Sequence, residues 1–172
     1  MFRTIALLFI IAATYCVTAN AQIADSWRAF RSDKGKFSVK VPCKMDLEVK
    51  KADPKDPNDI DQIYHSCDAA AGYFAVIYVD FKIVLDDKSM LDTYSGGLTE
   101  GSTLVSQKDI KLGRLPGREL VLTKNQNGVD LKFRWRVYLK GKRLYALTVG
   151  TEASAAASPD VTKFLTSFTV LK

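Results

Sequence analysis

A run of alternating residues between Leu131 and Lys140 constrains the fold of this chain more than any other feature. Its odd-numbered positions are all apolar, and its even-numbered positions are basic except for Tyr138. A two-residue period places alternate side chains on opposite faces of a β-strand. Gly141 permits a tight reversal, so we expect a returning strand from Leu144 to Val149. That second run is apolar at nearly every position, which predicts an interior strand covered on both faces.

Further strands are expected along most of the chain. Patterns of alternation or continuous apolar character predict them at residues 37–41, 45–49, 60–67, 73–79, 104–112 and 119–124. The first two alternate and flank Pro42, so we expect them to pair as a hairpin. The run from Tyr73 to Val79 is apolar on both faces and predicts a second interior strand.

Two helices complete the predicted fold. Asp86 or Asp87 begins one that carries Met90 and Leu91, although Gly96-Gly97 leaves its end open. Ser158 caps the other, and its apolar positions have helical spacing, at Val161, Phe164, Leu165 and Phe168. We therefore expect an α+β fold with an antiparallel sheet of about six to eight strands packed with two main helices.

The N-terminal residues have the features of an export signal. An apolar run from Ile5 to Ile11 precedes the small-x-small sequence Ala19-Asn20-Ala21. This order predicts a signal peptide over residues 1–21. After its cleavage we expect a single mature domain from Gln22 to Lys172, in the periplasm or outside the cell, with no stable membrane span. A retained anchor and lipid attachment at Cys16 are the alternatives, but the apolar run is shorter than a membrane span requires.

Two cysteines remain after the predicted cleavage. Cys43 and Cys67 would form a disulfide in an oxidising compartment, closing the interval that holds an aspartate-rich loop. His65 and Cys67 are two residues apart on one strand face, so the alternative is a soft-metal site made of Cys43, His65 and Cys67. The chain has no second histidine, which favours the disulfide.

The sequence contains no local signature of an enzyme. It lacks a Gly-x-Ser-x-Gly elbow, a Gly-rich phosphate loop and a dinucleotide fingerprint, so no cofactor is expected. Asp86 with Asp87, or Asp59 with Asp61, could supply an acid and a base. A hydrolase with dispersed carboxylates therefore stays an alternative to a binding module.

The best candidate binding feature is a set of residues that we call the basic strand face: Lys132, Arg134, Arg136, Tyr138, Lys140 and Arg143. Its arginines could hold carboxylates or phosphates of a protein or another anionic envelope component. The net charge of +6 is too small and dispersed to indicate nucleic acid. A solvated or edge-protecting strand face is the alternative. A two-residue loop at Gly141 would place Tyr145 and Leu147 beside the arginines, and a three-residue loop Leu144 and Ala146.

Four pieces of the chain carry a resemblance to a known class. They are Phe30-x-Ser32-x-x-Gly35-Lys36-Phe37-Ser38-Val39-x-Val41-Pro42, Gly113-x-x-Pro116-Gly117-Arg118-Glu119, Arg136-Val137-Tyr138-Leu139-x-Gly141-x-Arg143-Leu144-Tyr145 and Phe164-Leu165-x-Ser167-Phe168. In these pieces the chain resembles small exported bacterial proteins of the PsbP-like class. The resemblance implies an α/β/α sandwich and a non-enzymatic binding or assembly module, and it transfers no metal-binding or partner-binding residue.

Overall fold

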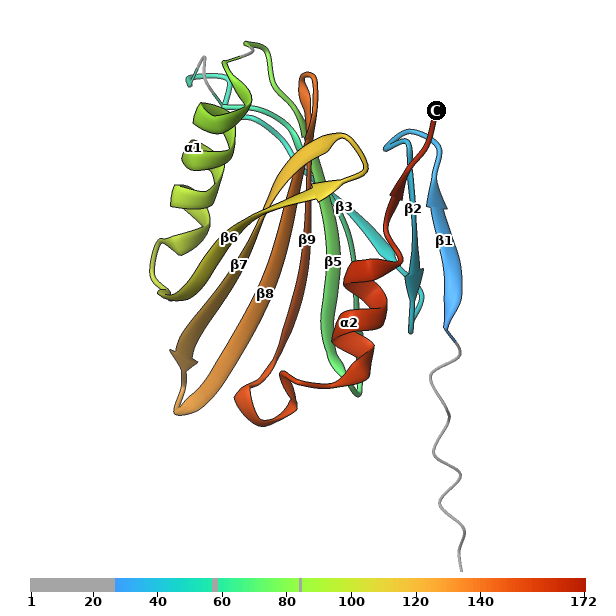
Figure 1. The fold of residues 1–172 in the computed structure, drawn as a ribbon, viewed down its shortest axis with the longest axis vertical. Helices are drawn as coiled ribbons and strands as arrows, with labels where there is room; N and C mark the ends of the chain where they lie inside the picture. The colour runs from blue at the N-terminus through green and yellow to red at the C-terminus, as the bar shows by residue number, and fades with distance from the viewer. Residues whose placement is uncertain (1–26, 57–58, 84) are drawn as a thin grey trace, which may run out of the picture.

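Antiparallel pairing joins every strand of this protein to its neighbours. The computed structural model describes residues 27–56, 59–83 and 85–172, which form two sheets, two α-helices and one short 3₁₀ helix (Figure 1). This arrangement confirms the predicted α+β class with a mostly antiparallel sheet, and strands dominate it. The predicted signal peptide, residues 1–21, lies outside the described residues.

The larger sheet has seven strands in the order β3-β4-β5-β9-β8-β7-β6. Their bounds are β3 Asp46–Lys50, β4 Gln62–Ala69, β5 Gly72–Asp80, β6 Thr103–Leu112, β7 Leu115–Gln126, β8 Val129–Lys140 and β9 Arg143–Glu152. Strand β9 is at the centre and β5 is beside it, so the two runs that are apolar on both faces are interior strands as predicted. Arg136 pairs with Leu147 and Tyr138 with Tyr145, which is the register of the two-residue loop.

The smaller sheet has the order β1-β2-β10, with bounds β1 Arg28–Ser32, β2 Phe37–Val41 and β10 Thr169–Val170. The predicted hairpin of residues 37–41 with 45–49 is therefore wrong, because β2 pairs with β1 and β10 whereas β3 pairs with β4. Alternation reveals the two faces of a strand but not its partner. The chain leaves one sheet at Pro42 and enters the other at Asp46.

The helices lie on opposite faces of the larger sheet (Figure 1). Helix α1 spans Asp87–Thr99, and Asp86 caps it by accepting a hydrogen bond from the Ser89 backbone N–H at 3.0 Å. Helix α2 spans Pro159–Thr166 after the 3₁₀ turn Ala153–Ala155 and has the predicted cap at Ser158. Gly96-Gly97 does not end α1. No helix in the described ranges is long and apolar enough to cross a membrane.

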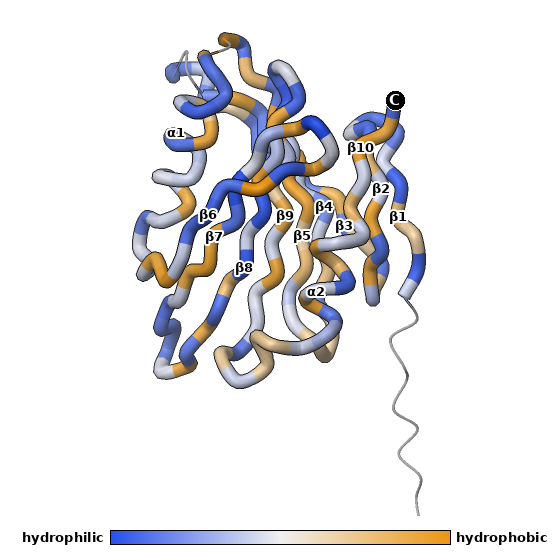
Figure 2. The backbone as a smooth tube through the Cα atoms, in the orientation of Figure 1, coloured by the Kyte–Doolittle hydropathy of each residue, from blue (hydrophilic) through white to orange (hydrophobic). Residues whose placement is uncertain are grey.

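Each face of the larger sheet has its own hydrophobic core. One core is packed between this sheet, the smaller sheet and α2, and its large, almost fully buried members include Phe37, Phe74, Tyr78, Tyr145, Phe164 and Phe168. The other lies beneath α1 and includes Met90, Leu91, Leu120, Val137 and Leu144. Figure 2 shows hydrophobic stretches along β2 and β5 and hydrophilic stretches along β6. The middle strands therefore contribute side chains to both cores.

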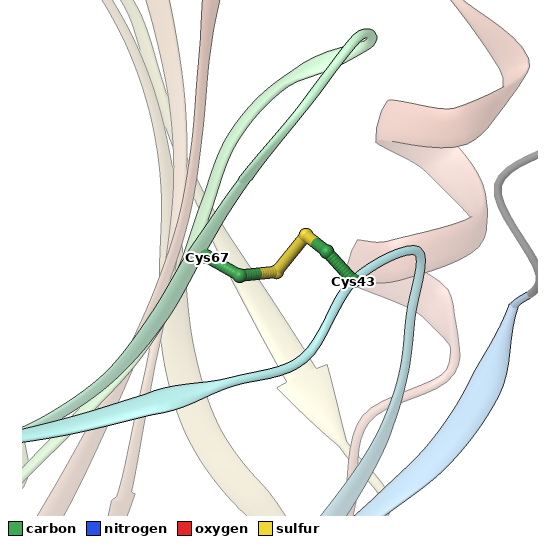
Figure 3. The surroundings of a disulfide bond; sticks show 2 residues. All are labelled: Cys43 and Cys67. Carbon is green, nitrogen blue, oxygen red and sulfur yellow. A yellow bond between two sulfur atoms is a disulfide. The ribbon is translucent and has the colours of Figure 1, made fainter.

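A disulfide connects the two sheets. Cys43 follows β2, Cys67 lies on β4, and their Cα atoms are 6.0 Å apart (Figure 3). The predicted pairing is thus present. The bond restrains the segment that leads from the smaller sheet to the larger one, next to the core that both sheets share.

Removing this crosslink should destabilise the protein. Cys43→Ala together with Cys67→Ala is expected to lower the free energy of unfolding by about 3 kcal/mol, because the unfolded chain regains loop entropy. Urea unfolding of the variant and of the oxidised wild type measures the difference. Reduced wild type is the control and should unfold like the variant; equal stability of all three forms would contradict a stabilising crosslink.

Candidate ligand pocket and basic strand face

Helix α1 is too narrow to cover its face of the larger sheet. Seven strands span about 29 Å in the hydrogen-bonding direction, whereas a helix with its side chains is about 10 Å wide. The main contacts of α1 are with β7 and β8. Arg118 on β7 also donates a hydrogen bond to Asp92 on α1 at 2.6 Å. The sheet surface over β4 and β5 is therefore left partly uncovered.

A pocket of about 780 Å³ lies in this uncovered region, between α1 and the sheet. Its apolar wall comes from several separate elements and is formed mainly by Ile60, Tyr64, Phe81, Tyr94, Leu98 and Trp135. Burial raises the pKa of Tyr94, so its phenol is neutral at physiological pH. The volume and the predominantly apolar lining are typical of small-molecule sites. No pattern in the sequence predicts this pocket.

Among the described residues, the charged side chains that line the pocket are at its two ends. Lys50 pairs with Gln62 at one end of the sheet, and Lys82 follows β5 at the same end, where α1 begins. Glu100 is the C-cap of α1. The lysines and Glu100 are therefore separated by the length of the helix, which is about 20 Å for thirteen residues.

The structure brings the middle of the basic strand face together around a carboxylate. Glu119 on β7, with a side chain only 6% exposed, accepts a hydrogen bond from Arg136 Nε at 2.7 Å. Lys108 Nζ is 3.0 Å and Arg134 Nη2 is 3.5 Å from the same carboxylate. Burial alone would raise the pKa of Glu119, but the hydrogen bonds from Arg136 and Lys108 outweigh it and lower the pKa. We call these four residues the Glu119 cluster.

The other residues of the basic strand face are dispersed. Tyr138 is buried, and its ring is parallel to that of Phe168 with 6.0 Å between the centroids. Lys140 donates to the backbone oxygen of Leu171, and Arg143 forms a two-pronged ion pair with Asp80. Lys132 and Arg134 are half-buried. Binding of an anionic partner by this face stays a prediction.

The residues of the alternative metal site lie in the core between the two sheets. His65 packs against Phe30, with 4.9 Å between ring centroids, and its Nε2 is 3.4 Å from Ser32 Oγ. The two cysteines are bonded to each other. Within the described ranges, no group of three or more His, Cys, Asp or Glu side chains is placed to hold a metal ion.

Three of the four candidate catalytic carboxylates have structural contacts, and the fourth, Asp87, lies in the first turn of α1. Asp86 caps α1, and Asp61 forms an ion pair with Lys51. Asp59 accepts hydrogen bonds from the backbone N–H groups of Asp53 and Ile60. These contacts organise the β3–β4 loop and the start of α1.

Comparisons with known proteins support the fold alone. No family model matches the chain, and a comparison with curated proteins gives no match. LpqN, described as involved in cell envelope biogenesis of Mycobacterium tuberculosis, is similar in structure with a TM-score of 0.53 and 12% identity, over 85% of this chain and 91% of LpqN. PA94 of Pseudomonas aeruginosa, a protein of unknown function, has a TM-score of 0.41 and 14% identity, over 76% of this chain and 85% of PA94. Beyond the shared α+β class, the PsbP-like resemblance stays a prediction.

The two central arginines of the basic strand face should differ in their effect on stability. Arg136→Gln is expected to lower the free energy of unfolding by about 2 kcal/mol, because it leaves the buried Glu119 carboxylate without its closest hydrogen-bond donor. Arg136 also donates to the backbone oxygen of Leu165 in α2. Arg134→Gln is the matched control and should cost less than about 1 kcal/mol. Equal losses in urea unfolding would contradict a special role for Arg136.

His65 should make stability depend on pH. Burial lowers the pKa of His65 from its ordinary value of 6.5, so the unfolded chain binds the proton more readily. The neutral His65 side chain therefore makes its full contribution to the free energy of unfolding above pH 6.5. This contribution is lost as the pH falls through the lower pKa of the folded state. Because the chain has one histidine, His65→Phe should flatten the decline in unfolding free energy between about pH 7 and about pH 5. Parallel pH profiles for the variant and wild type would refute this assignment.

Proposed function

We propose that this protein is an exported, non-enzymatic binding module whose ligand site is the pocket between α1 and the larger sheet. The observation that carries the proposal is a cavity of about 780 Å³ with an aromatic and aliphatic wall. Apolar surface left open to water is costly, and a pocket of this size is the usual form of a small-molecule site. The ligand class is an apolar or amphipathic small molecule.

Export is proposed on independent grounds. The predicted signal peptide ends at Ala21, and the two remaining cysteines form a disulfide, which persists in oxidising compartments. We place the mature protein in the periplasm or outside the cell, as one domain of PsbP-like organisation from Gln22 to Lys172. The description of LpqN is compatible with such a location, although the likeness supports the fold alone.

A binding role is favoured over hydrolysis by the chemistry of the pocket. Among the described residues that line it, Glu100 is the only carboxylate, and it lies at the end away from the two lysines. General acid–base hydrolysis needs a second titratable group near the same substrate bond. The hydrolase alternative would therefore have to use carboxylates outside this pocket.

Adjacent glycines of α1 offer a matched pair of positions for testing the site. A Cβ atom added at Gly96 or Gly97 would meet no atom within 4 Å, so both positions tolerate a side chain. Gly97 lines the pocket and Gly96 does not. A large side chain at Gly97 should therefore reduce the pocket, whereas the same side chain at Gly96 should not.

The neutral probe N-phenyl-1-naphthylamine should bind to the pocket and change the fluorescence of Trp135. Gly97→Phe is expected to weaken binding by roughly tenfold, equivalent to about 1.4 kcal/mol, while Gly96→Phe should leave affinity unchanged. Trp27, which packs on Phe74 on the opposite face, is replaced by Phe in every variant so that Trp135 is the only tryptophan. Failure of the parent to bind, or equal weakening by both substitutions, would reject this site.

The basic strand face is a second candidate, for an anionic protein or another envelope component. Glu119 supplies one negative charge among Lys108, Arg134 and Arg136, and the Arg134 side chain is 25% exposed. The Arg134→Gln variant described above removes this charge with little expected cost to the fold. If anionic envelope components bind the variant as they bind the wild type, the Glu119 cluster is structural only.

A further inference from the structure

The charges along the pocket are arranged asymmetrically. Lys50 lies opposite Gln62, which in turn lies opposite Val79 at the end of β5, so Lys50 and Lys82 belong to one end of the sheet. The Nζ of Lys82 donates to the backbone oxygen of Asp59 at 3.2 Å, which holds the ammonium group near that end. Glu100 is at the far end of α1. A ligand lying along the helix would therefore meet positive charge first and negative charge last.

The carboxylates near Lys50 and Lys82 lie outside the pocket lining, and one of them, Asp59, interacts electrostatically with both lysines. Asp59, Asp61 and Asp86 are at the lysine end, and Glu48 lies opposite Tyr64, two residues before Lys50 on β3; none of these four carboxylates lines the cavity. Asp59 and Asp86 accept hydrogen bonds from backbone N–H groups, and Asp61 is bonded to Lys51 and to the backbone of Ala52. The lysines are thus the charged side chains that a ligand in the described part of this end would contact.

The surface beside the lysines is strongly apolar. Ile83 and Leu85, in the segment between β5 and α1, line the pocket and have 71% and 54% of their surface exposed. Large aliphatic side chains at this exposure beside two ammonium groups match a molecule with a charged head and an apolar chain. Trp135 and Leu98 continue the apolar wall toward the other end of α1.

We propose that the pocket binds an anionic amphiphile, with its head at Lys50 and Lys82 and its chain along α1 toward Leu98. This inference rests on the proposed function and specifies its ligand class. An anionic head gains attraction from both ammonium groups, whereas a cationic head would be repelled there and drawn toward Glu100. A neutral head would be attracted neither to the ammonium groups nor to Glu100.

Three amphiphiles with the same ten-carbon chain distinguish these possibilities: decanoate, decanol and decyltrimethylammonium. Their dissociation constants are measured below the micelle concentration from Trp135 fluorescence in the Trp27→Phe protein. Decanoate should bind roughly tenfold more tightly than decyltrimethylammonium, since partly exposed charge pairs each contribute a modest factor. Added salt should reduce that ratio.

Substitution of the lysines tests the position of the head. Lys50→Gln with Lys82→Gln should remove the preference for decanoate while leaving decanol affinity nearly unchanged. Lys40→Gln with Lys111→Gln changes the net charge equally at strand positions outside the pocket, and it should preserve the preference.

The outcomes separate this inference from the proposed function. Equal binding of all three amphiphiles, or tightest binding of decyltrimethylammonium, would overturn the anionic head while keeping the pocket as a ligand site. An unchanged preference in the Lys50 and Lys82 variant would overturn the position of the head. If none of the amphiphiles binds or displaces N-phenyl-1-naphthylamine, the proposed function itself fails.

Discussion

The width of the larger sheet relative to the elements that cover it determines the rest of this structure. Its middle strands, β5 and β9, have buried apolar side chains on both faces, so both faces need cover. On one face α1 covers β7 and β8; on the other, α2 and the smaller sheet cover the middle strands. One face has the aromatic pocket beside α1, and the other has the Glu119 cluster, in which Arg136 donates a hydrogen bond to α2.

Features encoded within a single segment could be predicted from the sequence. The two runs that are apolar on both faces identified β5 and β9 as interior strands, because only burial on both sides stabilises such a run. Ser158 followed by Pro159 identified the start of α2, since a cap and a proline satisfy the first turn locally. The disulfide followed from the number of cysteines left after the predicted signal peptide and from the predicted oxidising compartment.

Features that depend on distant segments could not be predicted. Strand β2 alternates whether its partner is β1 or β3, so its pairing was assigned wrongly. The pocket could not be predicted either, because it depends on how distant segments pack together. Ile60, Tyr64, Tyr94 and Trp135 have the periodicity of ordinary core residues, and nothing local indicates that α1 lies to one side of them. Lys50 and Lys82 are candidate ligand-binding residues only because they line that cavity.

Two rows of paired residues cross the whole sheet. They show that side chains are mostly apolar where helices or the smaller sheet cover the strands and ionic toward the edge formed by β6 and β7. Toward α2, one row from β6 to β3 is Lys108, Glu119, Arg136, Leu147, Val76, His65 and Leu47. Toward α1, the next row is Asp109, Arg118, Val137, Ala146, Ile77, Tyr64 and Glu48. Both rows are ionic over β6 and β7 and apolar over the middle strands. A shift of one residue between β7 and β8 would move Glu119 among the apolar side chains beneath α1. The ion pairs of Glu119 on one face and the buried Leu120 and Leu122 on the other therefore specify the same register for β7.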